Sequence, residues 1–392
     1  MTTPQMTTLQ VETVSAADLA PNPDSDNDKN PLILPDRQDT YNEWLNAQGI
    51  PVYRGFYIDV DELPLEHWEM KGVPAAFVIL EGTGGVNDGY VCEIPPGAKT
   101  KPQRHMYEET IYVTRGHGAT TIWQKDGKKH TFEWGPGSLF AIPLNANYQH
   151  FNSSGLEGAR FYAVTNCCFM MNMFHSVDYI FNNDYVFKDR FDGANGDFFS
   201  GEGRIQGRLF MTTNFVPDAR SIKLYDYSMR GKDSTNLKFN LASQSMGAHI
   251  SEFPVGSYKK SHRHGPGAHL IILNGKGYTL LWEPGKDEPM RVAWKPGTIV
   301  VPPDQWFHQH FNSGAERVRY LAIHRNNWAY KPLAKGADLK ASYTSIKDGG
   351  NQVDFEDEDP NIHCDFVEQL EASGAACVMC DYYPHCPKKK AG

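Results

Sequence analysis

The sequence predicts an all-β protein made of two copies of one domain, with only short helices at its edges. Glycine and proline are frequent, at 35 and 25 residues, and turn signals such as "PPG" and "KPG" separate apolar, β-branched runs. Helical periodicity is scarce. Two long stretches about 160 residues apart match each other, and a repeat of this length indicates a duplicated domain.

Size and charge limit the functions that the chain can have. Its 392 residues are enough for two domains with sizeable cores. The net charge of −9 argues against broad binding to nucleic acid or to anionic membranes. No apolar run approaches the roughly 18 residues that span a bilayer, and the N-terminus lacks the basic start of a secretory signal. The seven unevenly spaced cysteines are typical of a reducing compartment, so we expect a cytoplasmic protein.

The two ends of the chain carry the signals for disorder and for helices. Residues 1–35 are rich in Pro, Asp, Asn and Thr, and we expect them to be disordered. A short helix is predicted over residues 36–49, because a glycine and a following proline end the pattern there. A second helix is predicted over residues 359–374, where an Asp-Pro pair gives the N-cap and the first turn, and a glycine ends it.

The repeat consists of two motifs, each present twice. The first motif is "GAKTKPQRHMYEETIYVTRGHG" from Gly97 and "GSYKKSHRHGPGAHLIILNGKG" from Gly256. The second motif is "GSLFAIPLNANYQHFN" from Gly137 and "GTIVVPPDQWFHQHFN" from Gly297. In the second copy, "HLIILNGKGYTLLW" places two apolar runs around a Gly-Lys-Gly turn, so we expect these runs to pair as a β-hairpin.

Three histidines in "SHRHGPGAHL" raise the question of a metal site. His262 and His264 are two residues apart, so on a strand both side chains point to one face. His269 follows after "GPG", and strand parity turns it away from that face. An isolated His-x-His pair is weak evidence for a metal, and a third ligand from elsewhere in the chain is required.

In both copies the two motifs resemble the double motif of the cupin family. The second copy matches it at Gly256, His262, His264, Gly275, Gly297, Pro303, His308 and Asn312. The first copy matches it at Gly97, His105, Glu109, Gly116, Gly137, Pro143 and Asn152. The resemblance implies a bicupin, which is two small antiparallel β-barrels of the jelly-roll type, with the site inside the barrel.

The repeat and the resemblance together predict how the chain is divided. The predicted parts are a disordered segment (1–35), an N-terminal cupin with an entry helix (36–170), a connecting segment (171–234), a C-terminal cupin with the metal site (235–330) and a tail with a short helix and a cysteine cluster (331–392).

The resemblance implies a metal held by His262, His264 and His308 in the second copy. Three neutral imidazoles with open positions suit Fe(II), and less selectively Mn, Ni, Cu or Zn. Ala268 stands where the family carries a glutamate, which leaves space for a chelating substrate and O2. His310 lies two residues beyond His308 and is predicted to face the cavity as a catalytic proton carrier or substrate contact; a buried histidine bonded to the backbone is the alternative.

The first copy departs from the motif at two ligand positions. Gln103 and Tyr148 replace histidines there, and both side chains are poor ligands for divalent iron. We therefore predict that this barrel is a structural copy without a metal. The alternative is an unusual site formed by His105, Glu109 and His150.

Three arginines lie close in sequence to the predicted ligands or on a neighbouring strand. Arg263 lies between two predicted ligands, and we expect its side chain to point outward. Arg317 and Arg319 lie on the strand after the second motif, and one of them is a candidate for facing the cavity.

The second copy has a narrower resemblance as well. Its "HRHGPGAH" and "PPDQWFHQHFN" are similar to the metal cupin of the gentisate and salicylate 1,2-dioxygenases. That family implies Fe(II)-dependent oxidation of a small aromatic or metal-chelating substrate by O2. The alternatives are a non-oxidative decarboxylase, lyase or isomerase that uses the metal as a Lewis acid, and a bicupin that only binds a small molecule. Bicupins commonly self-associate, so we expect a homo-oligomer.

The C-terminal region concentrates the cysteines. "CVMCDYYPHC" brings three thiols together, and four thiolates can hold a tetrahedral zinc ion. A zinc or iron clip, a redox disulfide and ordinary tail cysteines all fit this spacing. The four residues are Cys364, Cys377, Cys380 and Cys386.

Overall fold

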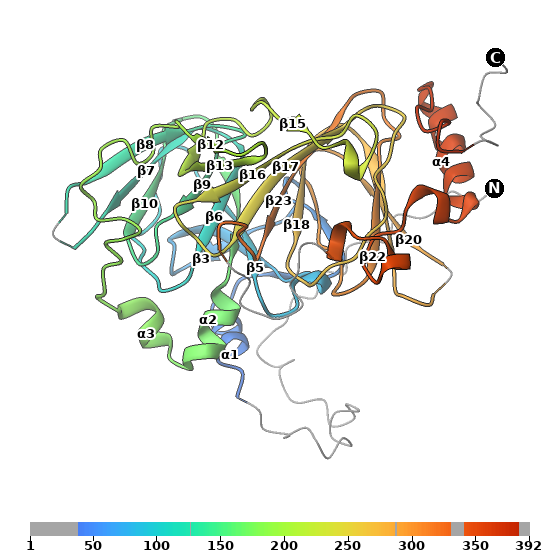
Figure 1. The fold of residues 1–392 in the computed structure, drawn as a ribbon. Helices are drawn as coiled ribbons and strands as arrows, with labels where there is room; N and C mark the ends of the chain where they lie inside the picture. Colours follow the sequence, from blue (N-terminus) through green and yellow to red (C-terminus); the bar gives the residue numbers. More distant parts are fainter. Residues whose placement is uncertain (1–37, 126, 287, 331–340, 384–392) are drawn as a thin grey trace.

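The computed structural model describes residues 38–125, 127–286, 288–330 and 341–383. Within them the chain is mostly β, in two halves that each combine a large sheet with a three-stranded one (Figure 1). The three-stranded sheets lie at the outer sides of the molecule and the large sheets near its centre. The predicted all-β fold of two jelly-roll barrels is confirmed. The segment 1–35, predicted to be disordered, lies outside the described residues.

The first barrel is built from an eight-stranded and a three-stranded sheet. The large sheet has the order β1 (Val52–Tyr53), β4 (Val73–Val78), β5 (Asp88–Ile94), β11 (Ala159–Thr165), β6 (Glu109–Arg115), β9 (Leu139–Ile142) and β14 (Phe215–Val216), with β3 (Glu66–Trp68) beside β4. The small sheet has the order β10 (Asn147–Asn152), β7 (Gly118–Trp123) and β8 (His130–Trp134).

The second barrel repeats this arrangement with a nine-stranded and a three-stranded sheet. The large sheet has the order β12 (Arg204–Gln206), β13 (Phe210–Thr213), β16 (Thr235–Leu241), β17 (Gly247–Phe253), β23 (Val318–His324), β18 (His269–Asn274), β21 (Thr298–Val300) and β2 (Tyr57–Asp59), with β15 (Tyr225–Asp226) beside β16. The small sheet has the order β20 (Met290–Trp294), β19 (Gly277–Trp282) and β22 (Phe307–Phe311).

The two barrels exchange strands. β2 comes from the N-terminal half but pairs with β21 of the second barrel, with Tyr57 opposite Val300. β14 comes from the predicted connecting segment and pairs with β9 of the first barrel, with Phe215 opposite Phe140. The large sheets therefore cross the boundaries that the repeat predicts, and neither barrel is a continuous piece of chain.

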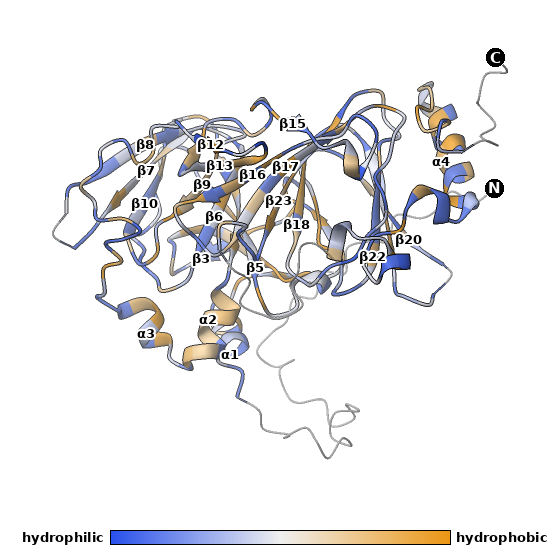
Figure 2. Ribbon diagram, viewed as in Figure 1, coloured by the Kyte–Doolittle hydropathy of each residue, from blue (hydrophilic) through white to orange (hydrophobic). Residues whose placement is uncertain are grey.

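A shared apolar core joins the two large sheets. Val91 and Tyr162 of the first barrel and Ile250, Ile271 and Leu321 of the second are fully buried in it. Figure 2 shows the apolar residues along the central strands β16, β17 and β18. Each large sheet thus has one face inside its barrel and the other against its neighbour. This explains why β18 is apolar at successive positions and does not alternate.

The predicted hairpin in "HLIILNGKGYTLLW" is wrong. β18 pairs with β21 and β23 of the large sheet, whereas β19 pairs with β20 and β22 of the small one. The turn between them, with Gly275 at φ 84°, carries the chain from one sheet of the barrel to the other. Two apolar runs joined by a short glycine turn form a hairpin only when both belong to one sheet.

The duplication extends to single hydrogen bonds that fasten the exchanged strands. Arg160 on β11 donates to Glu93 and to three backbone carbonyls just after β2. Arg319 on β23 donates in the same way to Glu252 and to three carbonyls in the segment after β14. Arg317 also pairs with Glu252. Neither Arg317 nor Arg319 therefore faces the cavity, because both are engaged by this carboxylate.

The helices lie at the edges of the barrels, at α1 (Thr40–Asn46), α2 (Cys167–Phe174), α3 (Val177–Asn182) and α4 (Pro360–Ser373). α1 is shorter than predicted, since Asp39 caps its N-terminus. α4 agrees with the prediction, from its Asp359 cap to the left-handed Gly374. None of the described helices is both long and apolar enough to cross a membrane. The expected self-association stays a prediction.

Replacing Arg319 tests whether its bonds fasten the exchanged segment. We expect Arg319→Ala to lower the free energy of unfolding by about 2–4 kcal/mol, because three backbone carbonyls and Glu252 lose a charged donor. Arg317→Ala is the matched control: its side chain is 44% exposed, so breaking the same type of ion pair should cost less than about 1 kcal/mol. Urea unfolding measures both values, and equal losses would contradict the special role of Arg319.

Candidate metal centre

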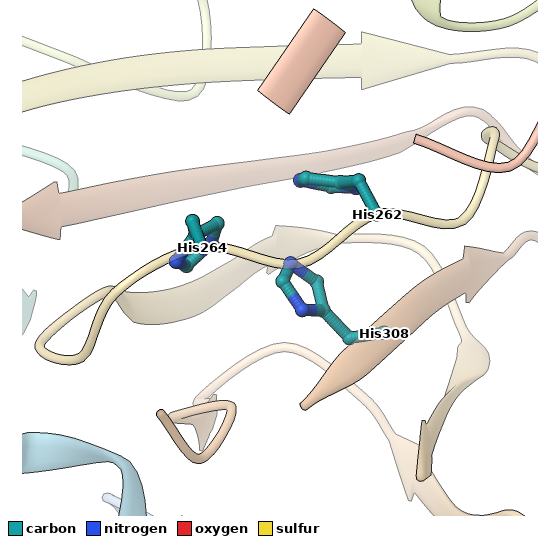
Figure 3. Close-up of side chains that lie close together, drawn as sticks. All are labelled: His262, His264 and His308. Atoms are coloured by element: carbon teal, nitrogen blue, oxygen red, sulfur yellow. The ribbon is translucent and has the colours of Figure 1, made fainter. Parts of the chain in front are cut away.

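Three imidazoles from two segments meet inside the second barrel (Figure 3). His262 and His264 lie on the extended segment between β17 and β18, and His308 lies on β22. A short antiparallel bridge holds the segments together, because the amides of His262 and His308 each donate to the other's carbonyl, at 3.1 and 2.9 Å. One nitrogen from each ring lies within 4.8 Å of the others. The sequence prediction therefore names three side chains that do come together.

The protonation state of the three rings suits the binding of a metal cation. Burial lowers the pKa of His262, His264 and His308, and nearby Arg230 or neighbouring imidazoles lower it further, so the rings are neutral near pH 7. The Nδ1 atoms face backbone carbonyls: Lys260 for His262 (3.4 Å), Gly265 for His264 (2.7 Å) and Trp306 for His308 (3.3 Å). Such bonds orient ligating imidazoles and leave Nε2 for the metal. The residues fit a divalent cation.

A cavity of about 210 Å³ opens beside these rings. Its wall is rich in basic and aromatic side chains, namely Arg230, Lys238, Lys259, Arg325, Tyr227, Tyr320, Trp328 and Tyr343. Burial lowers the pKa of Lys259 well below its ordinary value. No aspartate or glutamate of the described chain lines it. Ala268 lines it too, at the position that corresponds to Glu109 of the first barrel. The cavity therefore presents positive charge and donors without a carboxylate to balance them.

Sequence reasoning missed most of these cavity residues. They come from the segment before β16, from β16, β17 and β23, and from the C-terminal segment, none of which the motifs cover; Lys259, within the first motif, is the exception. One signal was available for Arg230, which lies as far before Gly256 as Lys71 lies before Gly97. Comparing the two copies upstream of the first motif would have marked a basic side chain at this position in both barrels.

His310 lies on β22 beside the candidate ligands, but it is not among the residues that line the cavity. Its Nδ1 lies 2.9 Å from the hydroxyl of Thr279, which also accepts from Trp294 at 3.0 Å. His150 in the first barrel makes the same contact with Thr120, at 2.7 Å. This Trp–Thr–His chain is thus present both with and without the three-histidine set, which favours the alternative of a buried structural histidine.

Two further predictions about side-chain direction agree with the contacts. His269 is buried between the barrels, where its ring nitrogens lie 2.8 Å from the hydroxyl of Tyr162 and 3.3 Å from the amide oxygen of Asn87. It is therefore not part of the histidine group. Arg263 donates to Asn351 at 3.1 Å and its guanidinium stacks over Phe307, so it lies outside the cavity.

In the first barrel a lysine ammonium occupies the region of the degenerate ligand positions. Lys71 is fully buried and donates to the hydroxyl of Tyr148 at 3.1 Å. Tyr148 and His105 each lie 3.0 Å from the same oxygen of Glu109, and Tyr90 donates to the other at 2.6 Å. Burial would raise the pKa of Glu109, but the Lys71 ammonium and these donors bring it well below its usual value. The carboxylate thus has an internal cation.

The spacing of the described residues does not support the alternative metal site of the first barrel, and the absence of a metal there stays a prediction. Among the described residues, the second-barrel histidines are the one group with metal-binding spacing, and His105, Glu109 and His150 are not such a group. Burial and the Lys71 charge lower the pKa of His150 to about 3, so its ring is neutral.

The C-terminal cysteine site is not settled by the described residues, because Cys386 lies outside them. Cys364 is exposed on α4, and Cys377 and Cys380 are half-buried beyond it. These three do not form a group with metal-binding spacing. A clip that needs the fourth thiol stays a prediction.

Removing the Lys71 ammonium should leave the buried Glu109 carboxylate without a cation beside it. We expect Lys71→Met to lower the free energy of unfolding by about 3–5 kcal/mol at pH 7. The loss should shrink as the pH falls toward the ordinary pKa of a glutamate. In wild type, the depressed Glu109 pKa contributes stability that is progressively lost as the pH falls below the ordinary glutamate value. In the variant, protonation of the unpaired Glu109 carboxyl removes the cost of a buried negative charge.

Lys101→Met is the control for this experiment, since its ammonium pairs with Glu69 at the surface. Denaturant titrations at several pH values give the comparison. A Lys71→Met loss that does not change with pH would contradict the pairing with Glu109.

In a comparison with protein families, the family model described as "Cupin domain" matches residues 90–165. No curated protein matches the chain. Similar solved structures include an oxalate decarboxylase OxdC mutant of Bacillus subtilis, 16% identical, covering 70% of this chain and 78% of that one, with TM-score 0.46. Another is the oxalate decarboxylase of Lactobacillus farciminis in a formate complex, with 13% identity, 74% and 91% coverage and TM-score 0.48. The resemblance to gentisate dioxygenases is not shown. Residues 90–165, in the barrel without the three-histidine group, are thus similar to a cupin domain.

Proposed function

We propose that the chain is a metal-dependent enzyme that acts on a small anionic substrate in the second barrel, with the metal as Lewis acid. The observation that carries this proposal is the convergence of His262, His264 and His308, of which His262 and His264 line a cavity of about 210 Å³. A set of three neutral ligands leaves the charge of a divalent cation uncompensated, so an anionic substrate is favoured beside it.

The three imidazoles are suitable ligands for Fe(II), Mn(II), Ni(II), Cu(II) or Zn(II). Such an ion would polarise a bound substrate oxygen and, if redox-active, could also bring O2 to the substrate. The set does not discriminate among these ions, since no carboxylate or thiolate is part of it.

The side chains of the cavity would bind and orient an anion. Arg230 is held by the carbonyl of Ser342 and the amide oxygen of Gln352, at 2.8 and 2.7 Å. Lys259 donates to the hydroxyls of Ser251 and Tyr320 at the cavity wall. Fixed donors of this kind stabilise negative charge that develops on a substrate, because they need no reorganisation during the reaction.

The second candidate function is the Fe(II)-dependent dioxygenase that the narrower sequence resemblance implies. The observation that favours it is Ala268, a small side chain that lines the cavity where a glutamate is expected. This leaves room for O2 next to a chelating substrate. The aromatic wall residues would also accommodate a ring.

One experiment separates the two chemistries. Protein loaded with Fe(II) or Mn(II) is mixed with catechols, gentisate, hydroxybenzoates and small keto- and dicarboxylic acids, with and without O2. The Lewis-acid reaction should proceed at the same rate without O2, and the oxygen electrode should record no uptake. Turnover that requires O2 mole for mole would establish the dioxygenase, and no turnover with any metal would leave a binding protein.

The metal ligands can be tested independently of activity. We expect His308→Ala to lose one metal equivalent per chain, because two imidazoles hold a divalent ion poorly. His310→Ala should keep it, since Thr279 engages its Nδ1 atom. Elemental analysis of the full chain measures both, and metal lost from His310→Ala but kept in His308→Ala would contradict the assignment.

Turnover measurements on the same variants test the catalytic role predicted for His310. A fall of about 10²- to 10⁴-fold in turnover with the metal retained is typical of a lost general acid–base group. Turnover near that of wild type would identify His310 as a structural residue of the Trp–Thr–His chain.

A further inference from the structure

A tyrosine from the C-terminal segment enters the cavity of the three histidines. Tyr343 ends a short 3₁₀ turn, Ala341–Tyr343, and lines this cavity. Backbone bonds fix the segment on the metal-site loop: the amide of Arg263 donates to Asn351 at 3.0 Å and that of Val353 to Ser261 at 2.9 Å. Tyr343 is therefore held in place by the same loop that carries the candidate ligands.

Two cations surround this phenol without a carboxylate to balance them. The guanidinium of Arg230 stacks over the Tyr343 ring at 4.3 Å from its centroid, and its described hydrogen-bond acceptors are neutral oxygens. The ammonium of Lys238 lies among the rings of Phe210, Tyr227, Trp328 and Tyr343, at 4.8–5.6 Å from their centroids. In the described part of the chain, neither cation forms an ion pair with an aspartate or glutamate.

The phenolic oxygen of Tyr343 is the acidic group that these cations can stabilise. It lies close to the side chains of Tyr227, Arg230 and Lys238, which act on its ionisation. Burial would raise the pKa of Tyr343, but the charges of Lys238 and Arg230 bring it below the ordinary value. Burial instead raises the pKa of Tyr320 to about 12 and that of Tyr227 further. Of these cavity tyrosines, Tyr343 ionises first.

Among its described residues, the cavity offers neither a carboxylate nor a strongly basic imidazole as a proton acceptor. No described aspartate or glutamate lines the cavity. Burial lowers the pKa of His324 to about 3 and that of His249 well below its usual value, so both rings are weak bases. Ala268 removes the carboxylate that could have served as a base beside the metal.

We propose that Tyr343 is the general base of this cavity, a role that rests on the proposed function. Its phenolate oxygen takes the proton of a substrate hydroxyl as that oxygen approaches the three-histidine set. The substrate O–H bond breaks, its electron pair stays on the substrate oxygen, and a new O–H bond forms on Tyr343. No oxidant is required. The substrate class is thus a small hydroxyl compound, such as a phenol, enol or hydroxy acid, that ionises on binding.

The first test asks whether the phenolate exists and requires no substrate. The full chain is loaded with Zn(II), which has no absorption of its own, and the near-ultraviolet absorbance of tyrosinate is followed against pH. We expect one tyrosine that ionises below the ordinary range in wild type, and its loss in Tyr343→Phe. Tyr330→Phe is the control, because that side chain is 47% exposed and does not line the cavity. The same titration in wild type and Tyr343→Phe would overturn the proposal.

The second test asks whether the phenolate acts on substrate. With a substrate found for wild type, Tyr343→Phe should keep its metal and lose about 10²- to 10⁴-fold in kcat/KM. The kcat/KM of wild type should rise with pH through the Tyr343 ionisation, and Lys238→Met should move that rise to higher pH. Arg230, Tyr227 and Tyr320 also face this group and stay unchanged in the variant.

The two tests separate the failure of the base from the failure of the proposed function. An unchanged kcat/KM in Tyr343→Phe overturns the base while the metal enzyme stands. A wild type without turnover for any metal overturns the proposed function, and the absorbance titration still shows whether Tyr343 is a phenolate.

Discussion

A charge buried inside a β-barrel must have a partner beside it, and this constraint organises both halves of the molecule. In the first barrel the partner is built in, since the Lys71 ammonium and the Glu109 carboxylate are joined through Tyr148. In the second barrel the equivalent carboxylate is replaced by Ala268, and Arg230 stands in the place of Lys71. What remains there, in the described chain, are neutral imidazoles and cations without a carboxylate partner. This interior is therefore suited to bind a metal ion and an anionic molecule from solution.

The duplicated fold makes the two interiors comparable in detail. Arg160 and Arg319 hold equivalent loops, and His150 and His310 take part in equivalent Trp–Thr–His chains. Features shared by both barrels belong to the fold, because they are present whether or not the three-histidine group is. Features found in the second barrel alone, namely the histidine group, the cationic wall and Tyr343, are therefore the better candidates for chemistry.

Much of the fold and part of the site could be predicted from the sequence. The all-β class followed from the turn signals and the repeat, and His262, His264 and His308 followed from two motifs that local spacing defines. The hairpin was misjudged because β18 is buried on both faces, so its apolar run carries no sign of which sheet it joins. Lys238 and Tyr343 were missed for another reason: they reach the cavity from separate segments, and only tertiary packing brings them to the motifs.

The exchanged strands also decide which sheet edge can be paired first while the chain is being synthesised. β9 has an open edge until residues 215–216 have been synthesised, whereas β21 finds its partner β2 already made. An exposed sheet edge is prone to pair with other chains, and such non-local pairing is slow. The N-terminal half is thus the vulnerable intermediate of biosynthesis. A fragment that stops before residue 215 would keep that open edge, and we expect it to aggregate more readily than the full chain.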